Sequence, residues 1–265
     1  MSSSTALLQY TLHLADDVLI LGHRNSEWTG HGPILEQDIA ISNIALDLIG
    51  QARNFFQYAA GLANMAKVGS NYPSGMGGQV TEDSLAYLRD GWDFRNSLLV
   101  EQTNGDWAKT ILRQFFFSAF QTDLYEQLAA GKDTTLAAIG AKAYKEAVYH
   151  LRWSSEWVIR LGDGTEESHQ RMKKALEELW KFTGELYMPA PYEAWAAGAG
   201  IGADLSRLQV RWEQRVKEVF DEAGLTYPAT EWMQTGGKEG RHTEQLGYIL
   251  AEMQFLQRAY PGCEW

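Results

Sequence analysis

The segment KEAVYHLRW, residues 145–153, places a glutamate four residues before a histidine in a stretch with helical spacing of apolar residues. Helix bundles that bind two metal ions use a glutamate three residues before a histidine, because positions i and i+3 share one helix face. The residue three before His150 is Ala147, so Glu146 lies one position outside that pattern. This helix therefore carries a metal site, a lost metal site or an ordinary polar surface.

Two literal matches to the glutamate–histidine spacing occur elsewhere in the chain. Glu166 and His169 open a predicted helix among polar neighbours, where acidic residues favour the helix dipole. Glu239 and His242 lie in GGKEGRH, which the glycines mark as a loop or a helix start. We interpret the first pair as a solvated first turn, and we do not expect the two pairs to form one buried site.

Two polar stripes with a spacing of four residues run along helices that are otherwise apolar. Such groups are costly to bury unless they are paired, so they either lie partly on the surface or form an internal hydrogen-bonded network. We predict the network, with these members: Asn43, Asp47, Gln51, Lys142, Glu146 and His150. Amides and an ammonium bring little negative charge, which makes this set a poor one for two iron ions.

The elements that position these side chains are predicted to be helices. The six prolines leave long stretches without a breaker, and the apolar spacing is helical throughout. We predict helices over about 5–24, 35–62, 82–100, 107–130, 134–161, 166–186, 205–223 and 243–258, with a loop over 67–81. Asp133 and Thr165 are predicted N-caps, and Gly131 and Gly162 are predicted C-caps. The helix over 35–62 is apolar on most sides, so we expect it to be central.

This pattern predicts an all-α protein with one domain over residues 1–265. The core bundle is expected to span about 5–187, and a C-terminal extension of loops and two helices about 188–265. The composition, with 45% apolar and 22% charged residues among 265, fits a globular chain that buries a sizeable core.

Charge and cysteine content exclude several functional classes. A net charge of -11 argues against nucleic acid and against an anionic membrane surface. The single cysteine, Cys263, forms no disulfide within the chain and is expected to be a bystander. No run of 18 apolar residues is present, and the N-terminal segment lacks a basic region before its apolar residues. We therefore expect a cytoplasmic protein.

Several long segments together resemble one known family. They include LDLIGQARNF (46–55) and TGGKEGRHTEQLGYILAEMQ (235–254), within similar stretches over 25–62, 98–116, 141–172 and 235–265. The chain closely resembles the non-catalytic, structural, ferritin-like subunit of bacterial phenylacetyl-CoA epoxidase (phenylacetate-CoA oxygenase). The resemblance covers nearly the whole chain.

The resemblance implies a ferritin-like bundle and a role in a multicomponent oxygenase for phenylacetate degradation. A homologous di-iron catalytic subunit would epoxidise phenylacetyl-CoA with O2, and a reductase would supply electrons. This chain would bind no cofactor of its own. It would pair with the catalytic subunit, support it, and act beside the other subunits of the complex.

The ligand positions of the catalytic relatives can be placed on this chain residue by residue. One glutamate–histidine pair corresponds to Leu48 and Gln51, and the other to Ala147 and His150. The acid of the third helix corresponds to Ser118. On the first helix either Asp16 or Asp17 corresponds to a ligand. In this correspondence KEAVYHLRW is a former ligand helix, because one residue rotates Glu146 by about 100° from the old site.

Two other functions stay open. The chain could itself be a di-iron oxygenase, if Glu146, His150, Asp47 and Asp17 converge with Gln51 or water. It could instead be a module that binds a CoA ester in the bundle or in a groove.

A surface for partners is expected on the long helices and in the aromatic C-terminal segment. Phe255, Tyr260 and Trp265 are either exposed anchors for a partner or a cover for the bundle's own core. Without its partner the chain could form a twofold homodimer through the same surface.

Overall fold

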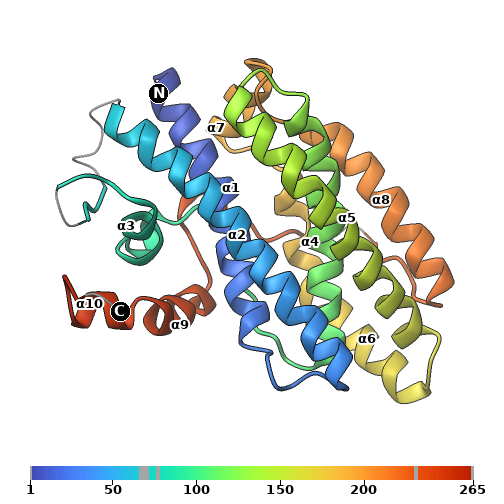
Figure 1. Cartoon of the computed structure of the whole chain (residues 1–265). Helices are drawn as coiled ribbons and strands as arrows, with labels where there is room; N and C mark the ends of the chain where they lie inside the picture. Colours follow the sequence, from blue (N-terminus) through green and yellow to red (C-terminus); the bar gives the residue numbers. More distant parts are fainter. Residues whose placement is uncertain (1, 66–71, 76–77, 230–231, 264–265) are drawn as a thin grey trace.

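The computed structural model describes residues 2–65, 72–75, 78–229 and 232–263, and within these ranges the secondary structure is helical, without a strand. Four long helices form the bundle, with shorter helices against it (Figure 1). This confirms the predicted all-α, ferritin-like bundle. None of the helices in the described ranges has the length and apolar character needed to cross a membrane.

The first pair of long helices is α1 (Ser3–Ser26) and α2 (Leu35–Met65), which pack tightly along their lengths. Gly22 allows this approach, because a Cβ there would lie 2.9 Å from the Ile49 side chain. The Ser2 side chain caps α1 by accepting a hydrogen bond from the Thr5 N–H.

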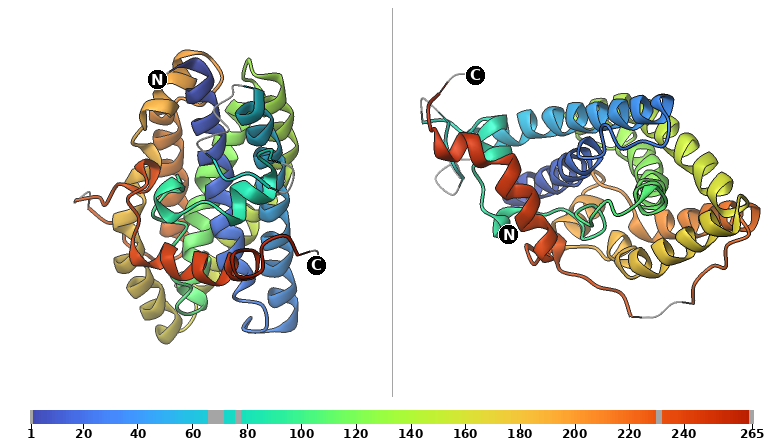
Figure 2. Two further views of the ribbon diagram at one scale, coloured as in Figure 1. Left: turned by 90° about the vertical axis from the view of Figure 1, so that its left-hand side faces the viewer. Right: turned by 90° about the horizontal axis from the view of Figure 1, so that it is seen from below.

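The second pair is α4 (Trp107–Ala129) and α5 (Thr134–Gly162). Asp106 caps α4, and Asp133 caps α5 as predicted, since its carboxylate accepts from the backbone N–H groups of Thr135 and Leu136. The turn between the helices is short, which makes them antiparallel neighbours. Figure 2 shows α1 and α4 in the middle of the molecule, with α2 and α5 on one side and α6 (Glu166–Leu179) and α8 (Leu205–Glu222) on the other.

The C-terminal ends of α4 and α5 differ from the predicted caps by one residue. The C-cap of α4 is Ala130, directly before Gly131, and the C-cap of α5 is Asp163, directly after Gly162. Gly162 is instead needed as the last residue of α5, because a Cβ there would lie 2.4 Å from the Ala223 carbonyl oxygen.

The central helices are α1 and α4, and the expectation that α2 is central was wrong. Both α1 and α4 are buried on nearly all sides. Helix α2 instead keeps one exposed face, on which Leu35 is 70% and Leu46 68% exposed. An apolar side chain does not by itself distinguish a core position from an exposed one.

The later helices cover the far side of α4 and one edge of α1. Helix α6 (Glu166–Leu179) starts at the predicted cap Thr165, whose hydroxyl accepts from the Ser168 N–H, and continues as 3₁₀ turns over Trp180–Phe182 and Gly184–Tyr187. Helix α8 (Leu205–Glu222) packs on α4 and α5. The Trp212 indole N–H donates to the Phe116 carbonyl, 2.9 Å away, which ties α8 to α4.

The C-terminal extension is more helical than predicted. Helix α7 (Pro191–Gly198), which was not predicted, packs on α1. The final predicted helix is two helices, α9 (Glu244–Met253) and α10 (Phe255–Ala259), and a 3₁₀ turn over Gly237–Glu239 precedes them.

The predicted helix over 82–100 is wrong beyond its first turns. Helix α3 spans only Glu82–Tyr87, and a 3₁₀ turn over Gly91–Asp93 follows it. The reason lies in α1, because the backbone N–H groups of Arg95 and Ser97 donate to the carboxylates of Asp16 and Asp17 instead of to helix carbonyls. Part of the predicted loop over 67–81 lies outside the described residues.

Candidate functional site

The positions matched to metal ligands lie inside the bundle. Leu48 and Gln51 on α2, Ser118 on α4, and Ala147 and His150 on α5 are all buried. Helices α4 and α5 meet there, since the Thr122 hydroxyl of α4 donates to the carbonyls of Ser118 and of Ala147. The candidate site is therefore one buried region between α2, α4 and α5.

Gln51 organises this region through the hydrogen bonds of its side-chain amide. Its side-chain carbonyl accepts from the Gln121 amide at 3.0 Å and from the Tyr125 hydroxyl at 2.9 Å. Its own amide N–H donates to the Glu146 carboxylate at 2.8 Å. Burial holds the pKa of Tyr125 well above its ordinary value, so its hydroxyl remains a hydrogen-bond donor.

Ser118 belongs to a second chain of amides along α4. The Gln114 amide donates to the Ser118 hydroxyl at 2.8 Å, and the Asn25 amide donates to the Gln114 carbonyl at 2.6 Å. These side chains satisfy one another's polar atoms inside the bundle, which is what a buried polar group requires.

His150 is paired rather than free for a metal. Its Nε2 lies 3.0 Å from Asp47 Oδ2, across the contact between α5 and α2. The other ring nitrogen, Nδ1, is buried and has no hydrogen-bond partner among the described residues. Asp47 is partly exposed, with 39% of its side chain accessible, so this pair connects the interior to the surface.

The predicted network therefore exists in part. Gln51 bonds Glu146, and Asp47 contacts His150, but Asn43 and Lys142 are exposed, and their predicted place inside the bundle was wrong. Asn43 lies one helical turn before Asp47, and Lys142 lies one turn before Glu146, but both Asn43 and Lys142 are on the solvent-exposed side. Glu146 thus takes its hydrogen bond from the amide of Gln51.

Asp16 and Asp17 of α1 are both buried, and both carboxylates accept hydrogen bonds from other residues. Asp16 forms a salt bridge with Arg89 and accepts from the Arg95 backbone N–H at 2.8 Å. Asp17 accepts from the Ser97 N–H at 2.6 Å and from its hydroxyl at 3.0 Å. Burial raises the pKa of Asp17, although nearby His13 and the Ser97 hydrogen bonds act in the opposite direction. Both carboxylates bind the segment after α3.

The donor set of this region does not fit two iron ions. In the correspondence that the resemblance implies, the hydrocarbon side chains of Leu48 and Ala147 stand at two glutamate positions, and the amide of Gln51 stands at one histidine position. In the described part of the chain no group of three or more His, Cys, Asp and Glu side chains is placed to hold a metal ion. Without convergent carboxylates the site has no means of balancing the charge of two iron ions.

A second buried charged cluster escaped the sequence analysis. Lys238, in the 3₁₀ turn before α9, lies 3.0 Å from the Glu193 carboxylate of α7, and His13 of α1 lies 3.3 Å from it. Burial opposes ionisation of Glu193, but Lys238 and His13 outweigh it and lower its pKa to about 2. Neither Lys238 nor His13 shows this cluster in the sequence, because their shared partner, Glu193, is distant along the chain. Glu193 lies 45 residues before Lys238.

The literal glutamate–histidine pairs are separate and structural. Glu166 is exposed, and His169 Nδ1 lies 2.7 Å from the Gly162 carbonyl at the end of α5. His242 lies 2.8 Å from the buried carboxylate of Glu101, whereas Glu239 is exposed and pairs with Arg241. The interpretation of the first pair as a solvated first turn is confirmed for Glu166.

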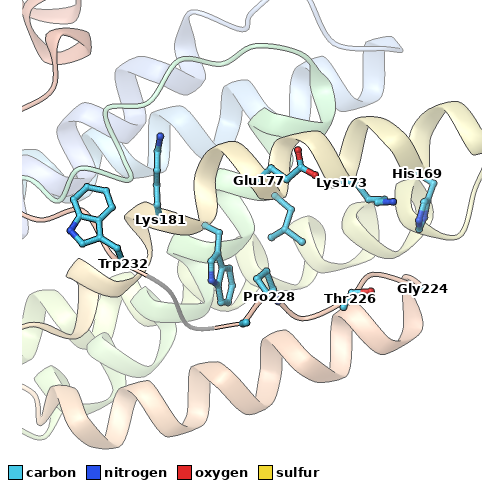
Figure 3. A pocket seen from close by; sticks show the side chains of 11 residues that line it. His169, Lys173, Glu177, Lys181, Gly224, Thr226, Pro228 and Trp232 are labelled. Atoms are coloured by element: carbon cyan, nitrogen blue, oxygen red, sulfur yellow. The ribbon is translucent and has the colours of Figure 1, made fainter.

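A groove of about 590 Å³ lies between α6 and the segment after α8. Figure 3 shows His169 and Lys173 at one end and Lys181 with Trp232 at the other. It is remote from the buried region of Gln51, since none of its lining residues belongs to α2, α4 or α5. The groove is therefore lined by other elements than those that carry Leu48, Gln51 and Ala147.

The C-terminal aromatic residues are exposed where they are described. Phe255 is 59% and Tyr260 53% exposed, and Trp265 lies outside the described residues. Phe255 and Tyr260 do not cover the core, and Cys263 is also exposed.

Comparisons with known proteins identify the family of the chain. The profile of a family described as phenylacetic acid catabolic protein matches residues 1–265. The chain is 48% identical, over 259 residues, to the C subunit of 1,2-phenylacetyl-CoA epoxidase from Escherichia coli (strain K12), covering 98% of this chain and 99% of that protein. The chain therefore belongs to the phenylacetic acid catabolic protein family.

Proposed function

We propose that the chain is the non-catalytic, structural subunit of a multicomponent phenylacetyl-CoA 1,2-epoxidase. It pairs with a homologous di-iron catalytic subunit and supports it, beside the other subunits and a reductase, in aerobic phenylacetate degradation in the cytoplasm. The similarity to the epoxidase subunit of Escherichia coli supports this assignment.

The observation that carries the proposal is the neutral hydrogen-bonded cluster of Gln51, Gln121 and Tyr125. It occupies the region in which the metal ligands of a catalytic bundle would lie. Leu48 and Ala147, at two of the matched positions, have hydrocarbon side chains, and both are fully buried. A bundle that keeps its fold and lacks the ligand set is suited to binding a partner, and not to activating O2.

Co-expression with the catalytic subunit tests the proposal. We expect the two proteins to elute together in size-exclusion chromatography, and epoxidation of phenylacetyl-CoA to require both of them with the reductase. A catalytic subunit that is soluble, iron-loaded and fully active without this chain would disprove the structural role.

A further inference from the structure

A buried cluster of four ionisable side chains joins α1 to the C-terminal extension. His13 and Asp17 come from α1, Glu193 from α7 and Lys238 from the 3₁₀ turn before α9, and each of these side chains is at most 5% exposed. We name these four residues the His13 cluster. Buried charges are costly unless they compensate one another, so the packing of the extension depends on how this cluster is protonated.

Both ring nitrogens of His13 face hydrogen-bond acceptors. Nδ1 lies 2.8 Å from the Arg95 carbonyl oxygen, and Nε2 lies 3.3 Å from Glu193 Oε1. Because the pKa of Glu193 is about 2, its carboxylate is ionised and has no proton to donate. A neutral imidazole carries a single N–H, so its second nitrogen would place a lone pair against one of these oxygens. The geometry therefore fits an imidazolium, which donates on both sides.

A protonated His13 makes the cluster electrically neutral, because two cations then balance the carboxylates of Asp17 and Glu193. Asp17 Oδ2 lies 3.8 Å from His13 Nε2, while Oδ1 accepts from the Ser97 N–H and hydroxyl. Burial opposes the charge on the ring, but Asp17 and Glu193 outweigh it and raise the pKa of His13, against the smaller effect of Lys238. A neutral ring would leave one buried negative charge without compensation.

The other ionisable groups around the ring are neutral or bound to partners of their own. Asp16 forms a salt bridge with an arginine of the segment after α3, and the Arg95 guanidinium donates to two backbone carbonyls. The buried Glu185 carboxylate accepts from two backbone N–H groups. Burial raises the pKa of Tyr10 and of Tyr192 well above the ordinary value, so both phenols stay neutral.

Lys238 connects the ring to the extension. Its ammonium donates to both Glu193 oxygens at 3.0 Å and to the carbonyls of Leu186 at 3.1 Å and Met188 at 3.3 Å. The Tyr192 hydroxyl donates to the Lys238 carbonyl at 2.8 Å. Helix α7 and the turn over Gly237–Glu239 are thus bound to each other, and the contact of Glu193 with His13 joins both to α1.

We propose that His13 is held as an imidazolium and that its proton on Nε2 holds α7 and the turn over Gly237–Glu239 against α1. The extension is then attached through a contact that depends on pH. When this proton leaves, the nitrogen lone pair faces the Glu193 carboxylate and the contact becomes repulsive. This inference concerns the folded chain by itself and does not depend on the proposed function.

The raised pKa of His13 makes the attachment weaker at alkaline pH. A histidine with a higher pKa in the folded chain than in the unfolded chain, where it is about 6.5, stabilises the fold fully below that pH. The stabilisation is lost as the pH rises through the folded pKa. Between the two pKa values the unfolding constant should increase by up to about tenfold per pH unit.

NMR of the full chain with isotope-labelled histidine tests the charge on the ring. The chain has six histidines, and contacts to the Tyr192 ring, whose centroid lies 5.7 Å away, identify the signals of His13. We expect the nitrogen shifts of an imidazolium at about pH 6.5 and a titration midpoint above that value. A midpoint at or below about 6.5 overturns the proposal, whatever the variants show.

Urea unfolding from about pH 6.5 to about pH 9 tests the contribution of the ring to stability. The wild-type chain should lose stability as the pH rises, and His13→Gln, which cannot be protonated, should lose clearly less. His31→Gln is the matched control, because it removes an exposed histidine, and it should keep the wild-type dependence. Equal pH dependence in the wild type and in His13→Gln overturns the proposal.

Hydrogen exchange of the wild-type chain locates the change without any substitution, and it decides together with the NMR midpoint if His13→Gln does not fold. After correction for intrinsic exchange rates, the protection of α7 and of the turn before α9 should fall over this pH range, while that of α5 stays constant. A loss of protection that is equal in α5 and α7, or no loss in α7, overturns the role of His13 in holding the extension.

Discussion

At the scale of single residues, the Gln51 side chain links the buried polar groups of α4 to the Glu146 carboxylate of α5. Gln51 is 2% exposed and uses both ends of its amide, accepting from Gln121 and Tyr125 and donating to Glu146. Glu146 is half-buried, so water solvates part of its charge. The network is therefore neutral at its centre and charged only at its rim.

Removal of the Glu146 carboxylate should destabilise the fold. Glu146→Ala leaves a buried amide N–H of Gln51 without its acceptor, and we expect the free energy of unfolding to fall by roughly 1–3 kcal/mol. Denaturant titration measures this change. Lys142→Ala, on the exposed side of the same helix, is the control, for which we expect a change within about 0.5 kcal/mol. Equal effects of the two variants would show that the stripe is solvated surface.

At the scale of elements, Glu101 anchors the start of α9. The carboxylate is fully buried and accepts from the Thr243 N–H and hydroxyl, each at 2.7 Å, and from Asn96 at 2.9 Å. His242 Nδ1 lies 2.8 Å from it. One side chain from the loop after α3 thus holds the first turn of a helix more than 140 residues away.

Glu101→Ala should release the C-terminal helices. The backbone and side chain of Thr243 lose their buried acceptor, so we expect faster proteolysis within 243–263 and a lower melting temperature. Limited proteolysis with mass spectrometry measures the cleavage positions. Glu239→Ala serves as the control, because that carboxylate is exposed and pairs only with nearby Arg241. Unchanged cleavage of α9 and α10 in Glu101→Ala would show that other contacts hold them.

Helix boundaries were predictable where the signals are local. Asp133 and Thr165 act as N-caps in the structure because their hydrogen bonds reach only three residues along the chain. The predicted helix over 82–100 failed because its backbone N–H groups bind carboxylates of α1, roughly 80 residues earlier. No local pattern encodes such a partner, since tertiary contacts override helix propensity.

At the scale of the whole molecule, the spacing of polar residues predicted only part of the site. The stripe on α2 and the stripe on α5 do meet, through Gln51 with Glu146 and Asp47 with His150. Gln121 and Tyr125 were missed, because α4 is buried on nearly all sides, so its sequence does not separate a polar face from an apolar one. Residues that complete a site from a central helix therefore need the packed structure to be found.

The last prediction concerns metal content. A di-iron bundle needs four carboxylates and two histidines around one cavity. In the proposed correspondence Leu48, Gln51, Ser118 and Ala147 stand at four of those positions. His150 is one potential metal ligand, but its Nε2 contacts Asp47. The chain purified alone from iron-replete cells should therefore contain far less than the about two irons of a loaded site.

Elemental analysis of the purified chain measures this directly, with the catalytic subunit from the same preparation as the positive control. His150→Ala should leave the small background of iron unchanged, because no cluster depends on that ring. A content of about two irons per chain that disappears in His150→Ala would show that the bundle binds metal after all, through a ligand set that includes Asp47 and Glu146. Iron that is unaffected by the substitution would instead be bound nonspecifically at the acidic surface, which a chain with a net charge of -11 favours.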